Sequence, residues 1–118
     1  MITAAHRFHG YGSLRGVYQR GQNLRGPLLS LKFNRRDPGR PYRVAVVVSR
    51  KVNKSAVTRN RIRRRIYEVV RTTDDRIAPG TDLVFTVFDD KVAALPAAEL
   101  QASIGELLQK AAQTASQP

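Results

Sequence analysis

The stretch SRKVNKSAVTRNRIRRRIYEVVR, residues 49–71, decides how the rest of the chain is interpreted. It holds nine basic residues and a single acid, Glu68. Like charges packed this densely repel one another, so the folded chain alone gains little from them. A polyanion gains much more, because each phosphate that is neutralised releases condensed counterions. The stretch therefore predicts an element that binds nucleic acid.

The same stretch has the periodicity of a helix that is buried along one side. Asn53 or Ser55 can serve as its N-cap, and the helix is expected to run to about Arg71. Aliphatic residues recur at helical spacing and form one narrow stripe, at Ile62, Ile66, Val69 and Val70. Arg64 lies opposite this stripe, and Glu68 can pair only with Arg64 or Arg65. We expect the aliphatic side to anchor the helix and the cationic side to stay free.

Charge is distributed unevenly along the 118 residues, whose net charge is +12. Residues 1–71 carry 18 Lys and Arg against 2 acids, and residues 72–118 carry 3 against 7. The first two-thirds is therefore expected to meet the polyanion, and the last third to be scaffold. The length fits one RNA-binding domain, residues 1–118, with frayed ends at 1–6 and 113–118.

Several classes of function are disfavoured by the sequence. No run approaches the ~20 apolar residues of a membrane-spanning helix, and the chain has no cysteine, which fits a reducing compartment. Residues 1–12 bear arginine and no acid, but the chain from residue 13 onward has the pattern of a folded domain rather than of a transit peptide. His6 and His9 are expected to be exposed bystanders, and Asp89 and Asp90 to decorate a strand end. We expect no catalytic residue and no metal ligand on this chain.

The remaining segments alternate between helical and strand patterns. Helices are expected at 14–20 and from Pro96 to about residue 112, and strands at 28–33, 42–49 and 81–88, with a further short strand around 23–25. The strand at 42–49 is apolar on both faces, which suggests a central position in the sheet. The order predicts an α+β fold with one small mixed sheet, helices packed on it, and one parallel strand pair.

The first helix carries the clearest candidate for a contact outside the core. Ser13 is a plausible N-cap and Gly21 closes the helix at its C-terminus. Leu14, Val17 and Tyr18 share one face. Packing on the sheet explains Leu14 and Val17, whereas the ring of Tyr18 can sit at the rim of a groove and stack on a base.

The sequence around Arg59, Asn60 and Arg61 resembles the protein subunit of bacterial ribonuclease P. The Arg-Asn-Arg tripeptide lies on a basic helix, and the segment LRGVYQRG at 14–21 resembles the first helix of that family. The strand at 28–33, the third strand and the closing helix also fall where the family has them. The sequence departs from the family pattern at Leu14, where phenylalanine is usual.

The resemblance implies a fold like the second domain of ribosomal protein S5, with a left-handed strand–helix–strand crossover. It also implies that an RNA subunit carries the active site, uses Mg²⁺ and removes the 5′ leader of precursor tRNA. The expected partners are ribonuclease P RNA and precursor tRNA, with no membrane and no obligate protein partner. The expected location is the bacterial cytoplasm.

Two sets of site residues are implied by the resemblance. The surface for the RNA subunit is expected to comprise Lys51, Lys54, Arg59, Asn60, Arg61, Arg63 and Arg64. The cleft for the leader, beside the first helix, is expected to be lined by Leu14, Tyr18, and Lys32 or Phe33.

Two other functions compete with an accessory subunit of an RNA enzyme. One is a basic RNA-binding protein of the ribosomal type with no catalytic partner, which the same architecture would serve. The other is a basic protein of a membrane surface, which is disfavoured because the helix uses its only apolar stripe in the core.

Overall fold

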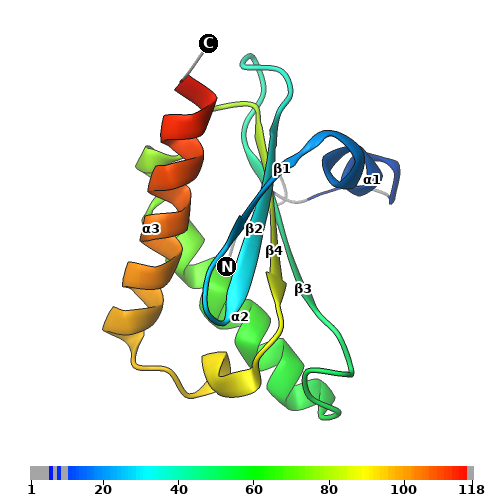
Figure 1. Ribbon diagram of the computed structural model, residues 1–118, viewed down its shortest axis with the longest axis vertical. Helices are drawn as coiled ribbons and strands as arrows, with labels where there is room; N and C mark the ends of the chain where they lie inside the picture. Colours follow the sequence, from blue (N-terminus) through cyan, green and yellow to red (C-terminus); the bar gives the residue numbers. More distant parts are fainter. Residues whose placement is uncertain (1–5, 7, 9–10, 117–118) are drawn as a thin grey trace.

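The computed structural model describes residues 6, 8 and 11–116, and they form one mixed sheet flanked by helices on both sides (Figure 1). The elements follow in the order α1 (Tyr11–Arg20), β1 (Gln22–Arg25), β2 (Leu29–Arg35), β3 (Arg43–Val48), α2 (Ala56–Thr72), β4 (Thr81–Val87) and α3 (Ala97–Ser116). Short 3₁₀ turns, η2 (Asp74–Arg76) and η3 (Asp90–Ala93), precede and follow β4. The predicted α+β class is confirmed.

The sheet has the strand order β1-β2-β4-β3. The pairs β1–β2 and β2–β4 are antiparallel, and β3–β4 is parallel. The parallel pair is joined through α2, as the strand–helix–strand pattern predicts. The hand of that crossover stays a prediction from the resemblance.

The expectation of a central position for the second long strand is wrong, because β3 lies at the edge of the sheet. Its alternate residues Val44, Val46 and Val48 are buried in the core, whereas Ala45 and Val47 on the other face are half-buried. Two side chains bond outward-facing backbone groups of this edge: the Tyr67 hydroxyl accepts from Val46 N at 3.3 Å, and His6 Nδ1 lies 2.9 Å from Tyr42 O. Such contacts occupy backbone groups of an edge strand that could otherwise pair with a strand of another molecule.

The main core lies between the sheet and the pair α2 and α3, on the left of the sheet in Figure 1. Phe85 at its centre is fully buried, and the α2 stripe of Ile62, Ile66, Val69 and Val70 packs there as predicted. The other face carries α1, anchored where Val17 and Val84 are both fully buried. Part of that second face has no helix over it (Figure 1).

Helix boundaries differ from the predictions at the start of α1 and at the end of α3. Helix α1 begins at Tyr11, so Ser13 lies inside it and is not its N-cap. Helix α3 continues to Ser116, past the expected end near residue 112 and into the segment 113–118 that was expected to fray. Gly21 follows α1 as predicted. A side chain would not fit at this position, because a Cβ would lie 2.4 Å from Val17 O and 2.9 Å from Phe33 O.

Candidate RNA interface

Helix α2 is fixed at its start by the short loop that precedes it. Ser55 is the N-cap, and its Oγ accepts from Thr58 N at 3.3 Å. The Asn53 side chain accepts from Ser55 N at 2.8 Å, so the two residues considered as caps act together. With the aliphatic stripe buried, the opposite side of α2 is directed away from the sheet.

Three arginines of α2 bind backbone carbonyls of neighbouring connections. Arg59 Nη1 donates to Asn53 O and Lys54 O, each at 3.0 Å. Arg61 Nε donates to Ala93 O at 3.1 Å. Arg65 binds the carbonyls of Val92, at 2.5 Å, and of Leu95. Arg65 was expected only as a possible partner of Glu68, whereas in the structure it ties α2 to the connection before α3.

Five further basic residues of this region, together with Asn60, form a surface that we call the cationic face. Its residues are Arg50, Lys51, Lys54, Asn60, Arg63 and Arg64. Arg63 donates to the side-chain oxygen of Asn60, which leaves the amide group of Asn60 able to donate. Arg50, Lys51, Lys54 and Arg64 are exposed, and none of them has an ion pair with a described residue.

The only acid of the helix is already in use. Glu68 pairs with Arg71, three residues further on, and not with Arg64 or Arg65 as expected. The Arg71 hydrogen bond lowers the pKa of the Glu68 carboxyl from its ordinary value. The charge of Arg64 is therefore available to an external anion.

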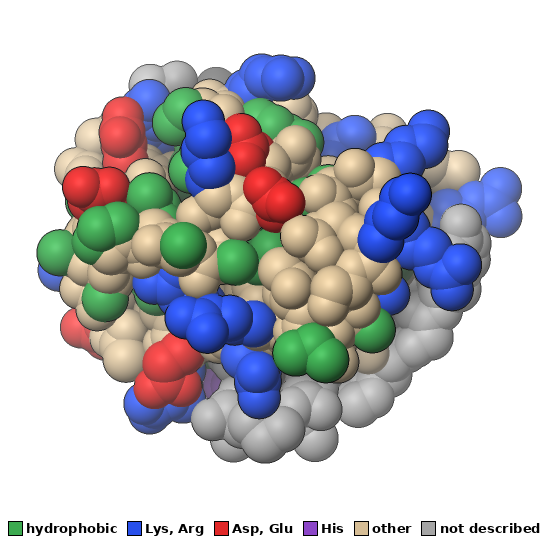
Figure 2. Space-filling model, turned by 90° about the horizontal axis from the view of Figure 1, so that it is seen from below, with side chains coloured by type: hydrophobic (Ala, Val, Ile, Leu, Met, Phe, Trp, Pro, Cys, Tyr) green, Lys and Arg blue, Asp and Glu red, His purple; other side chains and the backbone are tan. Residues whose placement is uncertain are grey.

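Figure 2 is a space-filling view of the molecule from below, and it shows where charged side chains lie on that face. Lys and Arg side chains gather along its right-hand edge, with no Asp or Glu among them. That edge is on the side of the sheet where α1 lies in Figure 1. Cations without nearby acids are the electrostatic pattern of a nucleic-acid surface.

A second candidate surface lies on the face of the sheet that carries α1, and we call it the open sheet surface. Its residues come from neighbouring strands in two register rows: Lys32 with Val84 and Ala45, and Ser30 with Thr86 and Val47. All of them except Val84 are half-buried. Tyr18, which is 44% exposed, stands at one border, and its ring centroid lies 5.5 Å from Lys32 Nζ.

The opposite border of the open sheet surface carries a second ring with a cation. The guanidinium of Arg25 lies 4.6 Å from the ring centroid of Phe88, which is 36% exposed. Neither residue was predicted, because the register that brings β1 next to the end of β4 cannot be read from the sequence. Exposed rings beside cations can stack on bases.

The structure separates the predicted leader residues. Leu14 is half-buried on α1, near Tyr18 in the sequence. Of the two open alternatives, Lys32 lies on the open sheet surface. Phe33 does not: it is 4% exposed and points into the main core. Successive strand residues face opposite sides, which is why only one of the two can line this surface.

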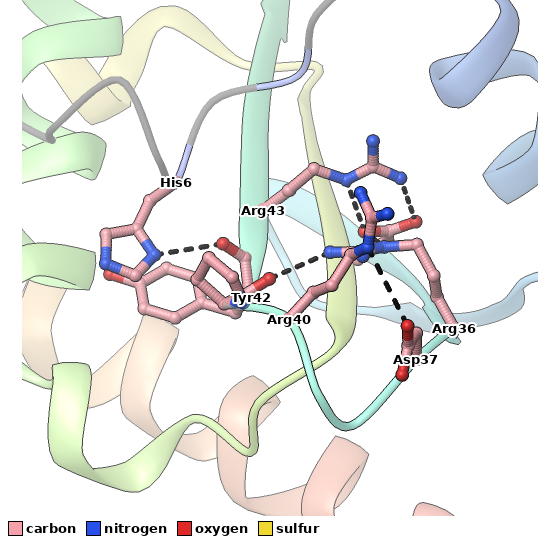
Figure 3. Close-up of polar contacts among 8 residues, drawn as sticks. His6, Arg36, Asp37, Arg40, Tyr42 and Arg43 are labelled. Atoms are coloured by element: carbon pink, nitrogen blue, oxygen red, sulfur yellow. Dashed lines mark hydrogen bonds and ion pairs between the residues drawn. The ribbon is translucent and has the colours of Figure 1, made fainter.

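The end of the sheet near α1 is held by a buried carboxylate, Asp82, which is 3% exposed (Figure 3). Its Oδ1 accepts from Arg36 Nε and Arg43 Nε, each at 2.9 Å, and its Oδ2 accepts from Arg43 Nη2 at 2.8 Å. Arg36 also donates to Pro41 O at 2.8 Å. The two arginines compensate the buried charge and fix the long loop between β2 and β3.

The first described residue packs against the same end of the sheet. The ring of His6 stacks on Tyr42, with centroids 3.9 Å apart (Figure 3). The Tyr42 hydroxyl donates to Asp74. His6 was expected to be an exposed bystander, and this expectation is wrong. His9 lies outside the described residues.

The described residues offer little to a metal ion. No three His, Asp or Glu side chains of residues 6, 8 and 11–116 come together as ligands. Asp82 is already bound by two arginines. In the same described part of the chain, no helix has the length and apolar character needed to cross a membrane.

Comparisons of sequence identify relatives across almost the whole chain. The family model for Ribonuclease P matches residues 3–112. The chain is 37% identical over 114 residues to the ribonuclease P protein component of a Synechococcus species, covering 94% of this chain and 85% of that protein. It is 38% identical over 112 residues to that of Chloroflexus aurantiacus, covering 93% and 80%.

Comparisons of structure agree on the fold. The RNase P protein of Staphylococcus aureus superposes with a TM-score of 0.76 at 20% identity, covering 91% of this chain and 95% of that one. The protein from Thermotoga maritima superposes with a TM-score of 0.71 at 22% identity, covering 82% and 89%.

Proposed function

Because this chain belongs to the ribonuclease P protein family, we propose that it is the accessory subunit of an RNA enzyme that removes the 5′ leader of precursor tRNA. The family is part of an RNA-processing ribonucleoprotein. In this proposal the RNA subunit carries the active site, and the protein binds and orients the RNA. The place of action is the bacterial cytoplasm.

One observation carries the proposal: the cationic face has basic side chains whose charge no neighbouring acid neutralises. Glu68 is the only acid of α2, and Arg71 binds it. In water these cations would only repel one another, whereas each contact with a phosphate releases counterions. We assign Lys51, Lys54, Asn60, Arg63 and Arg64 to the RNA subunit. Arg59 and Arg61 donate hydrogen bonds to backbone carbonyls, and we assign them the role of holding α2 against the neighbouring connections.

The open sheet surface suits a single strand of RNA better than a duplex. Its floor is half-buried and mixes small apolar and hydroxyl side chains, so an extended chain can lie on it. Tyr18 and Phe88 provide ring faces at its borders, and Lys32 and Arg25 provide charge beside them. Aromatic platforms next to cations bind unpaired bases with little sequence preference. We therefore assign this surface to the leader of precursor tRNA.

The proposal gives Mg²⁺ to the RNA and not to this chain. Mg²⁺ binds oxygen ligands in octahedral geometry and keeps several waters, which suits phosphate-rich RNA. Most of the described acids are engaged with a basic side chain, a polar side chain or the backbone of a turn. The protein contributes positive charge, which lowers the repulsion between RNA segments that Mg²⁺ otherwise has to screen.

The proposal is tested by cleavage of precursor tRNA with purified ribonuclease P RNA from a relative, at varied Mg²⁺. We expect the protein to lower the Mg²⁺ concentration required, and to cleave nothing without the RNA. A variant in which Lys51, Lys54 and Arg64 are all replaced by glutamine should lose most of this effect. Cleavage by the protein alone, or no effect on the RNA, would contradict the proposal and favour a basic RNA-binding protein without a catalytic partner.

A further inference from the structure

A cavity of about 330 Å³ opens between the sheet and the C-terminal half of α3, away from both the cationic face and the open sheet surface. Its floor is apolar, with Phe33, Leu83 and Leu108. Three arginines, Arg20, Arg35 and Arg76, line it together with this floor, and we call it the arginine-rimmed pocket. Its volume is within the range of pockets that hold one small ligand.

The pocket exists because the sheet extends beyond the large side chains of α3. Phe33 pairs with Leu83 and Arg35 pairs with Thr81 in the β2–β4 register, so these residues share the face that α3 covers. In its last turns α3 presents alanines, at positions 111 and 112, to this end of the sheet. Side chains this small cannot fill the space that leucine fills one turn earlier.

The charge of the pocket has one sign. No acid is among the residues that line it. Arg20, Arg35 and Arg76 are exposed, and none of their side chains makes a hydrogen bond or ion pair with a described residue. Three guanidinium groups around an apolar floor favour a ligand that is both anionic and partly apolar.

We propose that the arginine-rimmed pocket binds one nucleotide, with the base against the apolar floor and the phosphate held by the arginines. Guanidinium forks match phosphate oxygens in geometry and charge. Gln22, which pairs with Phe33 in the β1–β2 register, also lines the pocket, and its side-chain amide can donate to and accept from the edge of a base. A fatty acid would use the floor and one charge but make no use of this amide. The inference is independent of the proposed function.

The first test measures binding of each of the four nucleoside monophosphates to the full chain by calorimetry, with ribose 5-phosphate and inorganic phosphate as comparisons. We expect saturable binding of the nucleotides, and much weaker binding of the two comparison anions. Arg35→Gln and Arg76→Gln should each lower nucleotide affinity about tenfold or more. Arg15→Gln is the matched control, because Arg15 is exposed on α1 and does not line the pocket.

A second variant keeps the charge and removes the space. Ala112→Leu places a larger side chain at the wall of the pocket, and we expect it to abolish nucleotide binding while the arginines remain. No saturable binding in the millimolar range would overturn the proposal. So would equal binding of ribose 5-phosphate, or equal affinity of the Arg35→Gln and Arg15→Gln variants.

The nucleotide can be free or part of an RNA chain, and a competition experiment separates the two sources. Nucleotide binding is measured again with the protein saturated by ribonuclease P RNA. Loss of free-nucleotide binding to wild type, with Ala112→Leu weakening the RNA complex, identifies an unstacked nucleotide of the RNA. Unchanged nucleotide binding identifies a free nucleotide as the ligand.

Discussion

Arg64 and Arg65 are neighbours in α2, and we predict that they contribute to different properties of the protein. Arg64 is exposed and has no ion pair with a described residue. Arg65 is half-buried and donates to the carbonyls of Val92 and Leu95 in the connection between β4 and α3. The perturbation is the same at both positions, Arg64→Gln and Arg65→Gln, and each removes one positive charge.

The stability cost should fall on Arg65. A hydrogen bond from a charged donor contributes about 1.5–3 kcal/mol when it is buried, and less at a half-buried site. Losing two of them should lower the free energy of unfolding by about 2–3 kcal/mol, which corresponds to a decrease in Tm of about 10 °C for a chain of this size. Arg64→Gln should change Tm by no more than about 2 °C, because surface substitutions away from such contacts have small effects.

The cost in RNA binding should fall on Arg64. Each phosphate contact adds about 0.7–0.9 to the slope of log affinity against log salt concentration. Arg64→Gln should therefore flatten that slope by nearly one unit, whereas Arg65→Gln should leave it unchanged at a temperature where the variant is folded.

Thermal unfolding followed by circular dichroism measures the first property, and binding to ribonuclease P RNA by fluorescence anisotropy over a series of KCl concentrations measures the second. The reasoning is refuted if both variants lose the same stability. It is equally refuted if Arg65→Gln flattens the salt slope and Arg64→Gln does not.

Two further predictions concern the opposite face of the sheet. Tyr18→Ala should weaken binding of leader-bearing precursor tRNA about fivefold or more, since a stacked base contributes about 1–3 kcal/mol, while binding of mature tRNA and the Tyr18→Phe variant stay near wild type; equal losses for both RNAs would contradict the assignment. Asp82→Asn leaves Arg36 and Arg43 without their carboxylate and should cost about 3–5 kcal/mol in urea unfolding. Asp37→Asn breaks an exposed ion pair with Arg40, in which Nε and Oδ2 are 3.7 Å apart, and should cost about 0–1 kcal/mol. A cost for Asp82→Asn as small as that would show that the buried cluster does not hold the sheet.

Much of the fold could be predicted because it depends on periodicity. The aliphatic stripe of α2 repeats every three or four residues, and it set both the helix and its buried side correctly. The residues of β2 alternate in the same way, with Leu29, Leu31 and Phe33 buried. Such patterns are local, and local patterns are what a single sequence records.

The predictions were wrong where contacts between segments distant in the sequence determine burial or a side chain's partner. The five consecutive apolar residues in the second long strand suggested cover on both sides, but β3 is an edge strand with one face half-buried. The partner of Glu68 depended on side-chain geometry rather than spacing alone, and Arg65 was bound by a connection nearly thirty residues away. Asp82 gave no signal in the sequence, because its two arginines lie 46 and 39 residues before it.

The two surfaces that we propose bind RNA meet at the edge that β3 forms. Val47 on the open sheet surface and Lys51 on the cationic face are four residues apart, so a fully extended chain would separate them by at most about 14 Å. An RNA strand that leaves the sheet past Val47 therefore arrives next to the cations at the start of α2. In the proposed function, this geometry accounts for a β3 strand that is apolar on both faces although it lies at an edge. Val46 and Val48 lie in the core, whereas Ala45 and Val47, which the sequence alone suggests are core residues, belong to the surface proposed to bind the leader.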